Sequence, residues 1–337
     1  MKKITRFAAL LMTLCLMASC GLRTPLVTPT PEPTPTPQPQ IVRVGMLKGP
    51  TGLGAARLME QAGAGESKGQ YEFTVFAEPT EAVAALTKGE VDIAALPTNL
   101  ASVLYHKNED VKLLCLNTLG VLHILENGQR VNAMADLAGR TLYATGQGAN
   151  PEFVLNYLLT ESGLTPGEDV EIQWMASDAL AAAMALGEVD LCMLPVPAAT
   201  SVMIQNKDVR SALDLNDVWQ QVEAEGVLTM GCVVARDGFL TENGAAAELF
   251  LEEYGASIAY MSASENLDEA ASLAEKHGIV PKAAVAKKAI PDAGLCFVTG
   301  DDMIAGIQGY YQVLYSADPA SIGGSIPDGA FYYGYKG

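Results

Sequence analysis

The sequence has few basic residues and lacks the motifs of metal and redox sites. Lysine and arginine number 21 against 39 aspartates and glutamates, a formal charge of −18 at pH 7. Nucleic acids and anionic membrane surfaces bind basic patches, so this charge argues against both as partners. No CxxC motif occurs, and the three histidines, His106, His123 and His277, match no metal-ligand spacing. We therefore expect neither a metal nor a cofactor.

Cysteine is also sparse. Beyond the first twenty residues, Cys115, Cys192, Cys232 and Cys296 each stand alone in an apolar run. This pattern favours free thiols that pack as small hydrophobic groups. A disulfide remains an alternative in an exported protein, because pairing cannot be deduced from spacing.

The first residues have the pattern of an export signal. Lys2, Lys3 and Arg6 precede an apolar run, residues 7–17, and Met-Ala-Ser-Cys follows at its end. The run is much shorter than the roughly 20 residues that span a bilayer. We predict a signal peptide over residues 1–19 that resembles a bacterial lipobox, in which Cys20 becomes the lipidated, palmitate-bearing first residue. A plain signal peptide or an uncleaved anchor is the alternative.

The next segment is rich in proline. Seven prolines alternate with Thr, Glu and Gln before residue 40. Such a segment buries few apolar groups and favours an extended chain of about 3.1 Å per residue. We predict that residues 20–40 form the lipidated cysteine and a tether that places the protein outside the cell membrane, anchored to it by lipid.

One supersecondary unit occurs twice. Residues 81–104 read EAVAALTKGEVDIAALPTNLASVL, and residues 178–203 read DALAAAMALGEVDLCMLPVPAATSVM. Each copy predicts an Ala-rich helix, a Gly-Glu-Val-Asp turn, a short apolar strand ending in Leu-Pro, and a second helix. The spacing far exceeds the roughly 20–50 residues of a solenoid repeat, so it indicates two similar α/β lobes with a cleft between them.

Strands and helices alternate through both parts of the chain, which predicts doubly wound lobes with parallel sheets. In such sheets ligands bind beyond the carboxyl ends of the strands. We therefore expect the cleft to be lined by the loops Lys48–Gly52, Ala77–Pro79, Leu96–Asn99, Asn117–Gly120, Thr145–Asn150, Trp174–Ser177 and Leu194–Pro197.

The strongest local candidate is the loop TGQGANP, residues 145–151. Its two glycines allow backbone amides to turn inward, Asn150 can cap the next helix, and Pro151 suits the first helical position. An anion or a carbonyl group could bind to those amides and to the positive helix end. The alternative is an ordinary turn between strand and helix.

The other candidates have a structural alternative each. Lys48 attracts an anion or is simply solvated, while Thr51, Thr98 and Asn99 contact the solute or cap their helices. Trp174 stacks on a flat ligand or packs against a helix. The full set of predicted ligand-binding residues is Lys48, Gly49, Thr51, Gly52, Thr98, Asn99, Asn117, Thr145, Gln147, Gly148, Ala149, Asn150, Trp174 and Pro195.

Two acidic pairs, Glu90 with Asp92 and Glu188 with Asp190, precede the repeated strands. They lie at the end of the strand opposite the predicted cleft. We interpret them as solvated turn residues, and contact with a permease is a further hypothesis.

A family resemblance joins these observations. Residues 136–174 read DLAGRTLYATGQGANPEFVLNYLLTESGLTPGEDVEIQW, and the end of the chain contains SIGGSIPDGAFYY. With IVRVGMLKGPTG at the front, these segments resemble the NMT1/SsuA-like solute-binding proteins of nitrate, sulfonate, taurine and thiamine-precursor ABC importers. The resemblance covers nearly all of residues 41–333.

The resemblance implies an α/β type II periplasmic-binding-protein fold, with two lobes around a ligand cleft and two crossover segments. The crossings are expected near Val121–Glu126 and Gly231–Arg236. Lobe 1 would comprise residues 41–124 and 236–337, and lobe 2 residues 125–235.

The function implied is that of an extracytoplasmic receptor that delivers a neutral or singly anionic small molecule to an ABC permease and its ATPase. One alternative is a small-metabolite enzyme of the same fold. The sequence shows no evident nucleophile beside a base, so we expect no enzyme. Another alternative is a lipoprotein that presents its ligand to a membrane sensor.

Overall fold

The computed structural model describes residues 40–107, 110–222 and 226–335. The predicted signal peptide, Cys20 and almost all of the tether lie outside the described residues. The described residues form one compact unit. Within the described ranges, no helix is both long and apolar enough to cross a membrane.

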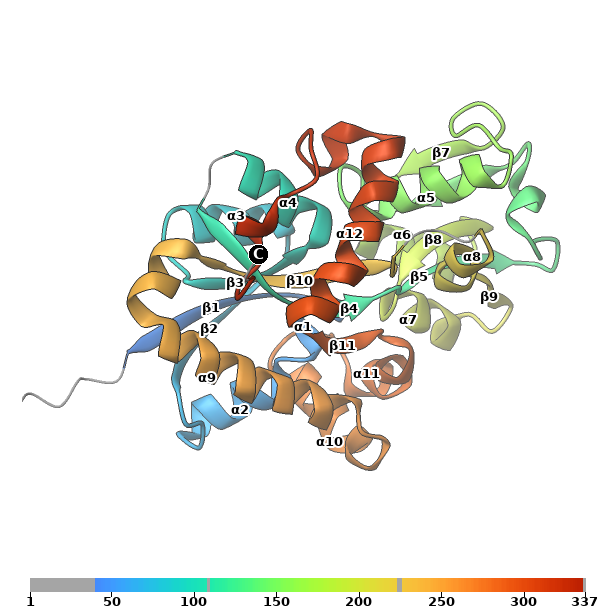
Figure 1. The fold of residues 1–337 in the computed structure, drawn as a ribbon. Coiled ribbons are helices and arrows are strands. Elements are labelled where there is room, and N and C mark those ends of the chain that lie inside the picture. Colours follow the sequence, from blue (N-terminus) through green and yellow to red (C-terminus); the bar gives the residue numbers. More distant parts are fainter. Residues whose placement is uncertain (1–39, 108–109, 223–225, 336–337) are drawn as a thin grey trace, which may run out of the picture. The chain divides into compact units, whose positions relative to one another are not determined.

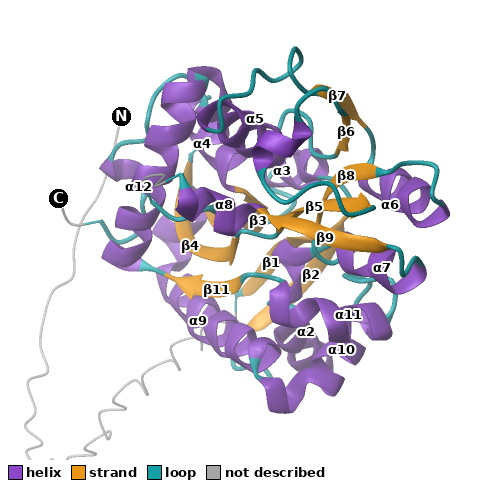
Figure 2. Ribbon diagram, turned by 90° about the vertical axis from the view of Figure 1, so that its right-hand side faces the viewer, coloured by secondary structure: helices purple, strands orange, loops and turns teal. Residues whose placement is uncertain are grey.

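Two mixed sheets form the framework (Figures 1 and 2). In the first sheet, β1 pairs in parallel with β2 and β3, while β10 runs antiparallel to β3 and β4. Its strands, in spatial order, are β11 (Leu295–Val298), β4 (Val111–Leu119), β10 (Thr229–Arg236), β3 (Ile93–Pro97), β1 (Ile41–Leu47) and β2 (Gln70–Phe76).

The second sheet repeats this arrangement with one strand fewer. Strand β6 is parallel to β7 and β8, and β5 is antiparallel to β8 and β9. Its order is β7 (Glu171–Trp174), β6 (Thr141–Ala144), β8 (Leu191–Pro195), β5 (Leu122–Asn127) and β9 (Val209–Asp214). The prediction of wholly parallel sheets is therefore wrong, because strands next to the lobe crossings lack the helical crossover that parallel pairing needs.

The sequence repeat corresponds to equivalent units of the two lobes. The first copy is α3 (Pro79–Thr87), β3 and α4 (Thr98–His106), and the second is α6 (Ser177–Leu186), β8 and α7 (Ala198–Gln205). Both strands bury four apolar residues and end on a half-buried proline. A left-handed glycine, Gly89 or Gly187, ends each Ala-rich helix, since glycine adopts that conformation without steric cost.

The chain crosses between the sheets at two places. Only Gly120 and Val121 separate β4 from β5, so the first crossing lies at the start of the predicted segment. The second crossing precedes Thr229, because all of β10 pairs in the first sheet. Its prediction at Gly231–Arg236 is wrong, since that apolar segment is a central strand rather than a connection.

Helices cover the sheets, and the segment after Asp237 adds β11 to the first sheet. Helix α12 contacts both β4 of the first sheet and α5 of the second lobe, and Figure 1 shows it between the two sheets. The remaining helices are α1 (Pro50–Leu53), α2 (Ala56–Ala64), α5 (Asn150–Glu161), α8 (Leu215–Gln221), α9 (Asp237–Ser262), α10 (Leu267–Lys276), α11 (Ala283–Ala289) and α12 (Gly300–Ala317).

Apolar periodicity explains how these helices pack. In α10, for example, Ala270, Ala271, Leu273 and Ala274 are buried on one face, while Asp268, Glu269, Ser272, Glu275 and Lys276 face solvent. The four cysteines of the described ranges are free thiols, as predicted, and all but the half-buried Cys296 are fully buried. Burial raises the pKa of Cys192 to about 12, so this thiol stays protonated and unreactive.

Candidate functional site

Polar residues from the carboxyl ends of β1 and β4 meet beside strand β10. The Asn117 amide group donates to the Thr51 carbonyl at 3.0 Å and to the Tyr254 hydroxyl at 2.9 Å. A Cβ on Gly231 would lie 2.8 Å from both Asn117 Oδ1 and Thr51 Cγ2, so only glycine lets these groups approach the strand. Thr51 and Asn117, two of the predicted ligand-binding residues, thus contact each other, and both are buried.

A second polar group joins the two lobes. Asn150, at the start of α5, is fully buried, and its Nδ2 donates to Thr98 Oγ1 at 2.7 Å and to the Met230 carbonyl at 2.9 Å. Its Oδ1 accepts the Asn99 backbone N–H at 3.1 Å. Three predicted site residues, Thr98, Asn99 and Asn150, therefore meet between the lobes.

The alternative that these residues cap their own helices is wrong. The N-cap positions are Ala149 for α5 and Pro97 for α4, and neither helix has a side-chain cap from its own segment. Pro151 is the second helical residue rather than the first. The cap of α1 is Gly49 rather than Thr51. Local sequence favours a cap, but partners in another segment hold the Asn150 and Thr98 side chains instead.

In the glycine loop before α5, one backbone amide is already hydrogen-bonded to a side chain of the same segment. Gly146 and Gly148 have positive φ angles of 86° and 76°, which favour glycine, as the turn prediction required. The Gly148 N–H donates to the Glu152 carboxylate at 2.6 Å. An anionic ligand would have to displace that carboxylate, so the loop is a poorer anion site than its sequence suggests. Thr145 is buried and Gln147 is exposed at its edge.

Several other predicted ligand-binding residues are either exposed to solvent or in contact with neighbouring parts of the protein. Lys48 is exposed, and the Gly49 N–H donates to the Ile279 carbonyl at 3.0 Å. A Cβ on Gly52 would lie 1.9 Å from the Leu47 carbonyl oxygen, so this glycine permits a tight backbone approach. Trp174 is half-buried and packs against the core, in line with the structural alternative.

Helix α12 adds residues that sequence reasoning missed. The Tyr311 hydroxyl donates to the Thr98 carbonyl at 2.8 Å, and the Tyr310 ring lies 5.7 Å from that of Trp219. Burial raises the pKa of both tyrosines, which keeps their hydroxyls protonated. The only sequence signal was an aromatic pair in an apolar helix, and such a pair is usually core.

One buried acceptor in this region is unsatisfied. The Asn99 side chain is 1% exposed, and its Nδ2 donates to the Ser321 carbonyl at 3.3 Å. Its Oδ1 has no hydrogen-bond partner among the described residues. A buried polar atom without a partner costs free energy, so Asn99 Oδ1 is a candidate to accept a hydrogen bond from a bound solute.

The buried charges lie elsewhere. Asp92 is 2% exposed and receives bonds from Arg43 Nε at 2.9 Å, from Arg43 Nη2 at 2.6 Å and from Arg236. Burial alone would raise the pKa of Asp92, but the Arg43 and Arg236 guanidinium groups hold it below its ordinary value. The prediction that Asp92 is solvated is therefore wrong, whereas Glu90, Glu188 and Asp190 are exposed as predicted.

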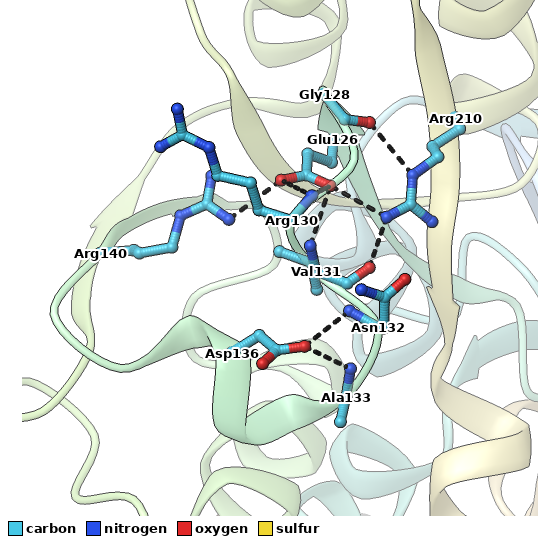
Figure 3. A network of polar contacts seen from close by, with 9 residues as sticks. All are labelled: Glu126, Gly128, Arg130, Val131, Asn132, Ala133, Asp136, Arg140 and Arg210. Atoms are coloured by element: carbon cyan, nitrogen blue, oxygen red, sulfur yellow. Dashed lines mark hydrogen bonds and ion pairs between the residues drawn. The ribbon is translucent and has the colours of Figure 1, made fainter.

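The second lobe has a comparable carboxylate, Glu126, which is 1% exposed (Figure 3). Arg140 Nη1 and Arg210 Nη2 each donate to it at 3.0 Å, and the Arg130 and Val131 backbone amides donate at 2.9 and 3.0 Å. Burial alone would raise the pKa of Glu126, but the Val131 amide and Arg140 hold it below its ordinary value.

The two buried carboxylates, Asp92 and Glu126, lie away from the polar residues that meet between the lobes. Asp92 precedes β3 and Thr98 follows it, so the five-residue strand separates them at about 3.3 Å per residue. Glu126 lies toward the far end of β5 from the crossing at Gly120. The buried polar residues on the cleft side of the described strands carry no charge: they are Thr51, Thr98, Asn99, Asn117, Thr118, Thr145, Asn150 and Thr229.

Two surface hollows lie away from these residues. One, of about 680 Å³, includes Lys112, Asp237 and Tyr335 in its lining, and another, of about 380 Å³, includes Asn132 and Asp217. Neither is lined by a predicted ligand-binding residue.

A protein-family model and several solved structures are similar to this chain. Residues 72–270 match the family model described as NMT1/THI5 like. An ABC transporter structure from Parabacteroides distasonis is similar at 22% identity and a TM-score of 0.71, over 87% of this chain and 98% of that one. No curated protein sequence matches.

Two further similar structures are of proteins named for the solutes they bind. The aliphatic sulphonate binding protein SsuA from Escherichia coli is similar at 17% identity and a TM-score of 0.66, over 83% of this chain and 88% of SsuA. The nitrate-binding protein NrtA from Synechocystis PCC 6803 is similar at 14% identity and a TM-score of 0.57, over 79% of this chain and 75% of NrtA. At these identities the similarity establishes the fold.

Proposed function

Because the chain belongs to the NMT1/THI5-like family and has the type II periplasmic-binding-protein fold, we propose that it is the solute-binding component of an ABC importer. The observation that carries this proposal is the meeting of buried polar residues from both lobes, Thr98 and Asn99 from one and Asn150 from the other. Closure of such lobes traps a solute, since the closed state offers contacts from both sides.

The solute we propose is small and neutral. The buried polar residues beside the cleft have no charge, and an anion would find its two best backbone donors already engaged. The Asn99 amide donates to Asn150, and the Gly148 amide donates to Glu152. A neutral molecule with a hydrogen-bond donor for Asn99 Oδ1 fits these groups better than a sulfonate or nitrate ion does. A singly anionic solute is the second candidate.

The cellular setting we propose rests on the sequence. The residues before Ile41 have the pattern of a signal peptide, a lipidated Cys20 and a proline-rich tether. A lipid-anchored receptor outside the membrane would deliver its solute to a permease of the same importer. The predicted ligand-binding loops, including Lys48, Gln147 and Pro195, remain part of this proposal.

A thermal-shift screen of the chain from Ile41 tests the function. Neutral aminopyrimidines are compared with nitrate and ethanesulfonate, and a solute at 100 times its Kd should stabilise the protein by about 2.7 kcal/mol. We expect the largest rise in Tm from a neutral solute that is recovered unchanged. Recovery of a converted product would instead support an enzyme, and a rise with the anions alone would contradict the neutral site.

A further inference from the structure

The side chain of Asn150 connects the two lobes directly. It belongs to the second lobe, yet every hydrogen bond it makes within the described residues goes to the first. In the segment after β3, the Asn150 side chain donates to Thr98 Oγ1 and accepts from the Asn99 N–H. It also donates to the Met230 carbonyl in β10, and this bond is shorter than its bond to the Thr229 carbonyl. The Thr98 hydroxyl, which accepts from Asn150, in turn donates to the Thr229 carbonyl at 2.9 Å, so it links Asn150 to β10 as well.

One of these bonds caps a helix of the opposite lobe. The first four N–H groups of a helix have no partner within it, and the Asn99 N–H is the second of those in α4. Pro97 occupies the cap position and has no side-chain acceptor. Asn150 Oδ1 thus supplies from lobe 2 the bond that a Ser, Thr, Asp or Asn cap supplies in other helices.

Separation of the lobes has to break this set of bonds together. The carboxamide donors, the carboxamide acceptor and the Thr98 hydroxyl are all buried, so their hydrogen bonds are replaced only when water enters the opening cleft. The same movement removes the cap from α4. We propose that Asn150 is a latch that holds the lobes closed and so sets the fraction of open molecules before any solute binds.

The latch regulates the binding site, and that consequence rests on the proposed function. A solute can leave a closed receptor only through the open state, so a stronger latch slows release. Entry also requires an open molecule, which lowers the rate of association by the fraction of molecules that are closed. Asn150 would therefore act on the solute through lobe closure rather than by contact.

Small-angle scattering of the solute-free chain from Ile41 tests the latch. Asn150→Ala removes the carboxamide, and Thr98→Val removes the hydroxyl with little change of shape. We expect the radius of gyration to increase in both variants, and the double variant to open no further than Asn150→Ala, because the two residues share one set of bonds. Two controls should match the original protein: Thr98→Ser, which keeps the hydroxyl, and Asn132→Ala, which alters an exposed asparagine of the same lobe.

Amide hydrogen exchange provides the second readout. Exchange of the Asn99 N–H should accelerate about tenfold in Asn150→Ala, and far-UV circular dichroism should show unchanged helix content. An unchanged radius in both Asn150→Ala and Thr98→Val would overturn the latch, even if Tm fell, since a purely structural bond lowers Tm without opening the lobes. If Asn150→Ala fails to fold, Thr98→Val alone decides. Because no solute is used, failure of the proposed function would leave these results unaffected.

Discussion

Replacing Glu126 with alanine should lower the free energy of unfolding by about 3–5 kcal/mol, the range for removing one partner of a buried ion pair. The carboxylate is 1% exposed and accepts bonds from Arg140, from Arg210 and from two backbone amides. Its loss leaves the buried Val131 N–H without an acceptor and removes the charge that compensates two guanidinium groups. Figure 3 shows Glu126 at the centre of this network, in which Arg210 also donates to the Gly128 and Val131 carbonyls.

Urea denaturation measures this loss. Glu188→Ala is the matched control, since Glu188 is an exposed glutamate of the same lobe and its loss should change stability by less than about 0.5 kcal/mol. Glu126→Gln should fall between the two, because the amide oxygen still accepts hydrogen bonds without carrying charge. A loss below about 1 kcal/mol for Glu126→Ala would contradict the role of this network.

Replacing Asp92 with alanine should cost about 2–4 kcal/mol, somewhat less than the Glu126 variant. Its guanidinium partners on Arg43 and Arg236 are 38% and 33% exposed, so water can solvate part of the charge that is left behind. The Arg43 backbone N–H, which donates to Asp92 Oδ2 at 3.1 Å, also loses its partner. Strands β1, β3 and β10 would be held less firmly at this end of the sheet.

The repeat supplies an exact internal control for this variant. Asp190 occupies the equivalent position in the second Gly-Glu-Val-Asp turn and is exposed. Asp190→Ala should leave the urea midpoint within experimental scatter of the original protein. Equal losses from Asp92→Ala and Asp190→Ala would show that the arginine pair does not distinguish the two turns.

The same comparison shows where sequence reasoning reaches its limit. The two turns have identical residues, yet Asp92 is buried because Arg43 and Arg236 come from strands 49 and 144 residues away. Local patterns predicted the repeated helix, strand and helix in each lobe, since apolar spacing and punctuating glycines act over short distances. They could not predict which distant side chains meet at a strand end.

For the candidate site, too, local patterns selected some of the residues but did not predict their distant partners. The rule that ligands bind beyond strand ends selected Thr98, Asn99 and Asn150, and the structure brings these three together. The alternative in which they cap their own helices was wrong, because the partners of Asn150 belong to the other lobe. Tyr310 and Tyr311 escaped prediction altogether, since nothing in the sequence of α12 places it between the lobes.

Asn99 provides the most direct test of a solute site between the lobes. Its buried Oδ1 has no partner within the described residues, so a bound solute should donate a hydrogen bond to it. Calorimetric titration of the strongest aminopyrimidine hit should give one site per chain in the original protein. Asn99→Ala should weaken the affinity about tenfold, which corresponds to about 1.4 kcal/mol, while the exposed Asn132→Ala should leave it unchanged. Equal affinities for the original protein and Asn99→Ala would contradict a binding site between the lobes.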